Sequence, residues 1–96
     1  MSVVYTVGAL ADLEGILSYI ARHDRNAAAD VAARIEKAIA DIAQFPHASR
    51  LDPGTGVREH VISGLPFLII YTASDRAIEI IAIFHTARNP AIKAHK

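Results

Sequence analysis

Residues 64–90 read GLPFLIIYTASDRAIEIIAIFHTARNP and contain two apolar runs separated by a short polar segment. The runs, Leu65 to Tyr71 and Ala77 to Phe84, are rich in isoleucine and aromatic residues, which favours β-strands. Residues 72–76 between them are small or polar, as is typical of a turn. The stretch therefore predicts a β-hairpin, and it ends in the polar sequence His85-x-x-Arg88.

The second predicted strand of this hairpin is apolar on both faces. Strict alternation of side chains places Ile78, Ile80, Ala82 and Phe84 on one face and Glu79, Ile81, Ile83 and His85 on the other. A strand of this kind is normally covered on both sides. The rest of this short chain has enough helix to cover one side, so we expect a partner protein to cover the other.

The composition indicates one small domain spanning residues 1–96, because 52% hydrophobic residues in 96 positions suffice for one core. The chain has no cysteine and no recognisable targeting or membrane segment, so we expect a cytoplasmic protein. Ten basic and ten acidic residues leave no net charge, which argues against strong direct binding of nucleic acid. The five histidines show no ligand spacing, and we expect neither a metal nor another cofactor.

The segments before the hairpin predict one strand followed by two helices. Residues 3–7 are β-branched and aromatic, and we expect this strand to end at Gly8. Apolar residues then recur at helical spacing from Leu10 to Ile20, and again from Val31 to Ile42, before Phe45-Pro46. Asp24 or Asn26 is suited to cap the second helix, and Asp30 with Arg34 and Lys37 with Asp41 are spaced to pair on it. The two helices are predicted to pack as an antiparallel hairpin.

Gly15 lies inside the first predicted helix, where glycine costs about 1 kcal/mol relative to alanine. It marks either a close approach by another backbone or a tolerated defect, and we favour the defect. After the helices, residues 47–56 have the composition of a loop, and Val57 to Val61 alternates as a strand with one polar face. The order predicts an α+β domain of the form β-α-α-β-β-β, with the helical hairpin packed on one face of an antiparallel β-sheet.

Several short motifs, in this order and spacing, resemble the RelE/ParE superfamily of toxins from type II toxin–antitoxin modules. The motifs are Ala11-Asp-Leu13, Ile16, Tyr19-Ile20, Phe45-Pro46, Arg50, Val57-Arg58, Leu68-Ile-Ile-Tyr71, Glu79-Ile-Ile and His85-x-x-Arg88. The resemblance covers nearly the whole chain. It implies a small bacterial toxin that is neutralised by direct binding of a cognate ParD-like antitoxin on the open apolar surface, in a higher-order complex.

The two branches of the superfamily imply different activities. RelE-like members cleave mRNA in the ribosome and carry an arginine at the position that here is Leu68, and often a tyrosine near the C-terminus, which this chain lacks. Cleavage needs a general base and acid with cations on the phosphate, and Arg58, His85 and Arg88 are the best available set, with Arg50 and His60 beside them. ParE-like members keep an apolar strand here and inhibit DNA gyrase. We favour the ParE-like branch, and an inactive antitoxin-binding relative is the third alternative.

The residues expected to contact the target or the antitoxin are Arg50, Arg58, Leu68, Ile81, Ile83, His85 and Arg88. Simpler roles compete with these assignments. The simpler role for Arg58 is that of a solvated partner of Glu59 or Asp52, and the simpler role for His85 is that of a cap on a strand carbonyl. Arg88, beyond the strand, is the better candidate for contact with an external acidic group.

Overall fold

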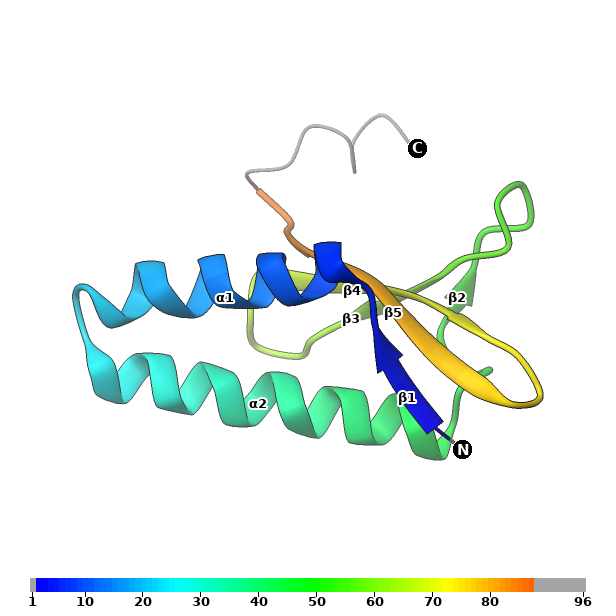
Figure 1. Cartoon of the computed structure of the whole chain (residues 1–96), viewed down its shortest axis with the longest axis horizontal. Helices are drawn as coiled ribbons and strands as arrows, with labels where there is room; N and C mark the ends of the chain where they lie inside the picture. Colours follow the sequence, from blue (N-terminus) through cyan, green and yellow to red (C-terminus); the bar gives the residue numbers. More distant parts are fainter. Residues whose placement is uncertain (1, 88–96) are drawn as a thin grey trace.

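The computed structural model describes residues 2–87. Its elements are β1 (Ser2–Tyr5), α1 (Val7–Ala21), α2 (Arg25–Gln44), β2 (Arg50–Leu51), β3 (Arg58–Val61), β4 (Phe67–Ala73) and β5 (Ala77–His85). The two helices run side by side as an antiparallel pair, and the sheet crosses next to them (Figure 1). The predicted α+β fold, with one N-terminal strand, a helical hairpin and C-terminal strands, is confirmed.

The sheet differs from the prediction in two respects. Its strand order is β1-β5-β4-β3-β2, and β1 pairs with β5 in parallel while the other pairs are antiparallel, so the sheet is mixed rather than antiparallel. The segment predicted as a loop after α2 also contains a two-residue strand, in which Arg50 lies opposite Glu59. The long connection between β1 and β5, through both helices and the other strands, permits this parallel pairing.

Side-chain caps set the beginnings of both helices. Thr6 caps α1 by accepting from Ala9 N at 3.0 Å, so the helix begins at Val7 and includes Gly8, which we had expected to end the strand. Asp24 caps α2 by accepting from Ala27 N at 3.0 Å, which settles the choice between the two predicted caps. On α2 the predicted Lys37–Asp41 pair is present at 3.3 Å. Arg34 instead donates to the Ser63 carbonyl at 2.9 Å and ties α2 to the β3–β4 turn.

Gly15 is a tolerated defect in α1. A Cβ at this position would meet no heavy atom within 4 Å. Gly15→Ala should therefore raise the free energy of unfolding by up to about 1 kcal/mol, measured by urea denaturation, because alanine restricts the unfolded backbone. Gly64→Ala is the opposing control, since Gly64 has φ of 78° and its added Cβ would lie 2.6 Å from Arg34 Nη2. A destabilised Gly15→Ala protein would contradict this account.

The core lies between the helices and one face of the sheet. Its largest fully buried side chains are Ile35 and Ile42 of α2, Ile69 and Tyr71 of β4, and Ile78 and Ile80 of β5. The buried Tyr71 hydroxyl donates a hydrogen bond to the Pro46 carbonyl at 2.8 Å, just past the end of α2. The core therefore fixes β4 and β5 against α2 and leaves the ends of the sheet to be held by other contacts.

A β-bulge in β5 changes which residues face the helices. Ile70 lies opposite Ala82, whereas the next residue of β4, Tyr71, lies opposite Ile80, so Ile81 has no opposite partner. The extra residue reverses the alternation beyond it. Ile83 is therefore buried in the core together with Ile78 and Ile80. The predicted alternation, which places Ile83 on the face of Glu79 and Phe84 on the face of Ile78 and Ile80, is wrong beyond the bulge for this reason.

Candidate functional site

The C-terminal half of β5 has a strand on only one of its two edges. β1 pairs with β5 only from Ala77 to Ile80, whereas β5 continues to His85. Two side chains replace β1 along the next residues. Thr6 Oγ1 donates to the Ile81 carbonyl at 2.9 Å, and Asp12 Oδ2 accepts from Ile83 N at 3.0 Å. Helix α1 is thus tied through hydrogen bonds to a strand edge that β1 leaves uncovered.

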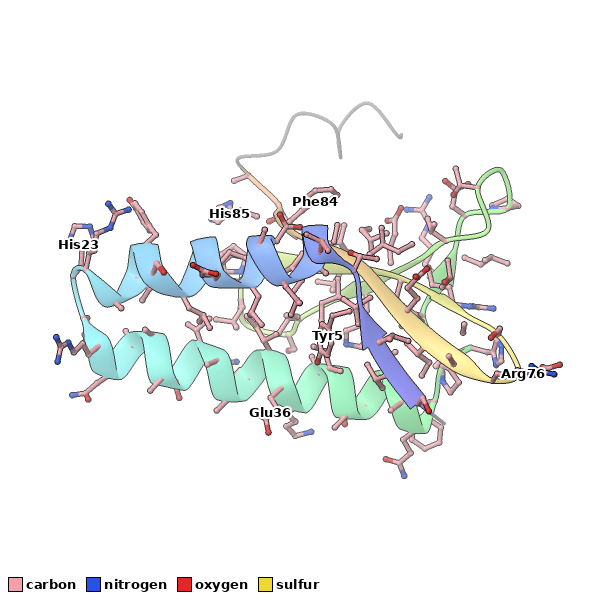
Figure 2. The ribbon with its side chains drawn as sticks, in the orientation of Figure 1. Tyr5, His23, Glu36, Arg76, Phe84 and His85 are labelled. Carbon is pink, nitrogen blue, oxygen red and sulfur yellow. The ribbon has the colours of Figure 1, made fainter. Side chains whose placement is uncertain are left out.

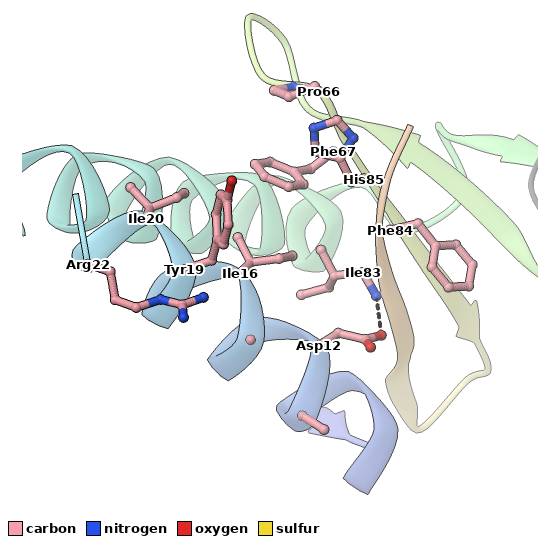
Figure 3. Close-up of a pocket in the computed structure, with 12 residues that line it drawn as sticks. Asp12, Ile16, Tyr19, Ile20, Arg22, Pro66, Phe67, Ile83, Phe84 and His85 are labelled. Carbon is pink, nitrogen blue, oxygen red and sulfur yellow. Dashed lines mark hydrogen bonds between the residues drawn. The ribbon is translucent and has the colours of Figure 1, made fainter. Parts of the chain in front are cut away.

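A groove of about 730 Å³ lies beside this edge. Its walls are one flank of α1, the start of β4 and the end of β5 (Figure 3). The apolar lining includes Ile16, Ile20, Phe67 and Ile83, and the polar lining includes Asp12, Tyr19, Arg22 and His85. A groove that is mainly apolar with a few polar groups is typical of a site for a peptide or small molecule.

An aromatic and cationic cluster forms one end of the groove. Arg22 Cζ lies 5.4 Å from the centroid of the Tyr19 ring, a cation–π distance. The Tyr19 and His23 rings meet edge to face at 5.6 Å, and His85 packs edge to face on Phe67 at 5.4 Å. His85 Nδ1 also accepts from Ala87 N at 3.2 Å. These contacts give this end of the groove aromatic surface together with the positive charge of Arg22.

Arg50 and Arg58 are both engaged within the chain. Arg58 Nη1 donates to the carbonyls of His47 at 3.2 Å and Ser49 at 2.9 Å, so this guanidinium holds the segment after α2 against β3. Arg50 Nη1 lies 3.6 Å from the Glu59 carboxylate, across the β2–β3 pair. Backbone carbonyls as acceptors of Arg58 were not part of the simpler role considered for it, which was a pairing with a carboxylate.

Two of the three possible nuclease residues, Arg58 and His85, lie apart on the sheet. Arg58 lies opposite Tyr71, whereas His85 lies opposite Phe67, four residues along β4. At about 3.3 Å per residue, this places the two side chains roughly 13 Å apart along the sheet. Figure 2 shows His85 at the end of β5 far from the hairpin turn that carries Arg76. Arg88, the third member of the set, lies outside the described residues.

The remaining predicted contact residues fall on different surfaces. Leu68 is only 4% exposed and lines a second, smaller pocket on the sheet face away from the helices. Ile83 lines the groove from its core side, and Ile81 is half-buried at the bulge. Of the polar candidates within residues 2–87, only His85 lies on the groove.

Three residues that line the groove were not predicted as site residues: Asp12, Tyr19 and Arg22. A signal for two of them was present, because Asp12, Ile16 and Tyr19 follow each other at steps of four and three and so share one face of α1. That face is the groove wall. Among residues 2–87, no three histidine or carboxylate side chains gather in the manner of metal ligands.

His60 is half-buried beside the segment that follows α2. Its Nδ1 lies 2.9 Å from Ser49 Oγ, in a hydrogen bond whose direction depends on the tautomer. Burial lowers the pKa of His60 below its usual value, and the charge of Asp41 opposes this shift without cancelling it. The folded protein therefore favours the neutral imidazole.

This pKa shift makes the stability depend on pH. The unfolded chain binds the proton of His60 more tightly than the folded chain, so the free energy of unfolding should fall as the pH drops through about 6.5. His60→Gln should lose less stability than the parent protein between about pH 7.5 and about pH 5.5, measured by urea denaturation. His23→Gln, at the exposed α1–α2 turn, is the control. Equal pH slopes for the parent and His60→Gln would contradict the assignment.

Comparisons with known proteins agree with this fold. Residues 3–90 match the family model for the ParE toxin of the type II toxin–antitoxin system parDE. The chain belongs to the ParE toxin family. It is thus a toxin of a type II toxin–antitoxin system in the RelE/ParE superfamily, and the resemblance inferred from its motifs is confirmed.

Individual relatives of this ParE-family toxin carry names from both branches. It is 38% identical over 86 residues to Toxin RelE2 of Caulobacter vibrioides, covering 90% of this chain and 96% of that protein. It is 37% identical over 81 residues to the protein Y4kP of Sinorhizobium fredii, covering 84% and 83% of the two chains. A structure of a chromosomal ParDE toxin–antitoxin system from P. aeruginosa is similar with a TM-score of 0.77 and 25% identity, covering 88% and 95%.

No helix among residues 2–87 of this toxin is long and apolar enough to cross a bilayer. The family implies an antitoxin as its partner. The groove beside β5 and the smaller pocket on the other sheet face are therefore the surfaces to consider for that partner and for the target.

Proposed function

We propose that this toxin inhibits DNA gyrase by binding it, and that a ParD-like antitoxin neutralises the toxin by filling the groove between α1 and β5. The observation that carries the choice of branch is the environment of Leu68, where RelE-like members carry an arginine. Leu68 is buried and opens onto an apolar pocket, with Ile70 and Phe84 as neighbours in its lining. Among residues 2–87, no lysine or arginine lines this pocket.

The chemistry of RNA cleavage also finds little support on the described residues. It requires an acid, a base and cations around one phosphate. Arg58 holds two carbonyls and lies far from His85, and the nearest charged groups to the Leu68 pocket include the carboxylates of Asp52 and Glu59. Carboxylates repel a phosphate. These features favour binding of a protein over catalysis on RNA.

The groove has features suited to a protein segment. Its lining is mainly apolar, and the edge of β5 beside it carries backbone groups that β1 does not reach. Since the N–H of Ile83 points to this edge, the N–H of His85, two residues on, points the same way. An antitoxin segment would bury the apolar lining and add hydrogen bonds at His85. Such a toxin acts in the cytoplasm, and dimeric antitoxins would assemble several chains into one complex.

Induction of the toxin in bacterial cells distinguishes the activities. We expect loss of negative supercoiling in a reporter plasmid, intact mRNA by primer extension, and recovery when the cognate antitoxin is produced with the toxin. Ribosome-phased cuts in mRNA with normal supercoiling would refute gyrase as the target. Unimpaired growth at a verified level of folded toxin would instead identify an inactive relative that retains only antitoxin binding.

A further inference from the structure

The first strand forms one edge of the sheet and lacks the features that usually protect a free edge. Within residues 2–87, β1 has β5 on one side and no strand on the other. Residues 2–11 read SVVYTVGALA and contain no charged residue and no proline. Natural edge strands usually avoid further pairing by carrying charges, proline or a bulge. β1 therefore presents a strand edge that is open to pairing.

The backbone groups on the outer side of β1 belong to Val3 and Tyr5. Thr6 N donates to the Ile80 carbonyl at 3.0 Å, so the Thr6 N–H points toward β5. The N–H groups of a strand alternate in direction, so the Val4 N–H also points toward β5. The residues on either side of Val4 turn both their N–H and their C=O groups the other way. The hydrogen-bonding groups of the outer edge are thus arranged symmetrically about Val4.

The side chain of Val4 lies on the face of the sheet away from the helices. Tyr5 is paired with Ile80, which is buried in the core, whereas Val4 is paired with the exposed Glu79. Tyr5 accordingly lies on the side of α2 (Figure 2), where burial and the Glu36 carboxylate raise the pKa of its hydroxyl. Val4 is 50% exposed. The centre of the outer edge is therefore an uncharged, half-exposed valine.

Such an edge is complementary to a second copy of itself. When two β1 strands lie antiparallel about a two-fold axis perpendicular to the sheet at Val4, Val3 of each copy lies opposite Tyr5 of the other. Each of these pairs exchanges both of its N–H···O=C bonds, which satisfies the outward backbone groups of Val3 and Tyr5. The two Val4 side chains meet on the axis as an apolar cross-strand pair. No like charges from β1 face each other across this axis.

Exposed apolar side chains next to the edge add surface that such a contact can bury. Val7 and Leu10 belong to the start of α1, directly after the strand, and are 85% and 51% exposed. Their spacing of three residues places them on one flank of the helix. Together with Val4 and Tyr5 they make up half of the exposed large hydrophobic residues of the described chain. A short strand pair is marginal in water without such apolar contacts.

We propose that β1 is a self-association edge, through which two copies of the toxin pair antiparallel about a two-fold axis at Val4. Their two sheets then join into one continuous sheet. No residue of β1 lines the groove beside β5, so the inference goes beyond the proposed binding of the antitoxin there and does not depend on it.

Cysteine cross-linking tests the register of this pairing. The chain has no cysteine, so Val4→Cys introduces a single thiol on the proposed axis, where Cα atoms about 4.5 Å apart suit a disulfide. Ser2→Cys is the matched control, since Ser2 is exposed on the same face of β1 but would lie roughly 14 Å along the strands from its copy. Under mild oxidation, Val4→Cys should form the covalent dimer at least about tenfold faster than Ser2→Cys. Equal rates for the two variants, both folded by circular dichroism, would overturn the proposal.

Amide hydrogen exchange on the unmodified toxin tests the pairing without a substitution. The N–H groups of Val3 and Tyr5 should be protected where sedimentation shows a dimer, and should exchange at least about tenfold faster on dilution to the monomer. The Val4 N–H, which points toward β5 in both states, is the internal control. A monomer at every concentration would overturn the proposal. Protection of Val3 and Tyr5 only after addition of the cognate antitoxin would also overturn it and would assign this edge to the antitoxin.

Discussion

Gly15→Trp in α1 should weaken binding of the cognate antitoxin by at least about 100-fold, or about 2.8 kcal/mol of binding free energy. Gly15 lines the groove, and a side chain built on it meets no other group of the toxin within 4 Å of its Cβ. The indole would therefore occupy space that we assign to the antitoxin. Because the site is on an exposed helix surface, the folded state of the lone toxin should be retained.

Two variants at the same helix turn separate this effect from general changes to α1. Glu14→Trp adds the same side chain at an exposed neighbour that does not line the groove, and it should bind antitoxin nearly as well as the parent. Gly15→Ala restores helix propensity with little added volume, and its affinity should also be near that of the parent. Calorimetric titration with the antitoxin measures all three. Equal losses for Glu14→Trp and Gly15→Trp would remove the groove as the binding surface.

Asp12→Ala should lower the free energy of unfolding by about 2 kcal/mol, the range expected when a hydrogen-bonded carboxylate is lost and a backbone N–H is left without its acceptor. Asp12 Oδ2 accepts from Ile83 N, where β1 no longer covers β5. No other acceptor is hydrogen-bonded to this N–H among the described residues. The predicted loss of stability would show that the Asp12 side chain holds α1 to the edge of β5.

Urea denaturation with two companion variants measures this contribution. Asp12→Asn keeps an oxygen acceptor and should lose clearly less stability than Asp12→Ala. Glu14→Ala, an exposed change on the same turn, should stay within about 0.5 kcal/mol of the parent. Hydrogen exchange at the Ile83 amide adds a local readout, since this N–H should exchange faster in Asp12→Ala. A stability equal to that of the parent would contradict the role of Asp12.

The helices and the hairpin could be predicted because their signals are local. Helical spacing, the Asp24 cap and the polar segment between two apolar runs each act over a few residues. The bulge at Ile81 could not be predicted in this way. Seven of the eight residues from Ala77 to Phe84 are apolar, so a shift of one residue in the alternation exchanges one apolar residue for another and leaves no trace in the pattern.

The candidate site was harder to predict from the sequence than the fold, because its contacts join segments that are distant in the chain. Arg58 is held by the carbonyls of His47 and Ser49, and no spacing rule relates a strand arginine to the carbonyls of a preceding loop. The Asp12–Ile83 bond likewise joins residues 71 positions apart. The groove face of α1 could be predicted from the helical spacing of Asp12, Ile16 and Tyr19. The strand edge opposite it could not, because its position depends on where β1 ends.

Supercoiling of relaxed plasmid by purified DNA gyrase with ATP, titrated with this toxin, tests the proposed activity most directly. We predict inhibition together with trapped cleaved DNA, reversed by prior addition of the cognate antitoxin. Gly15→Trp toxin should resist this reversal, because its groove is filled. Full supercoiling at a large molar excess of folded toxin, with no trapped cleavage, would contradict gyrase as the target.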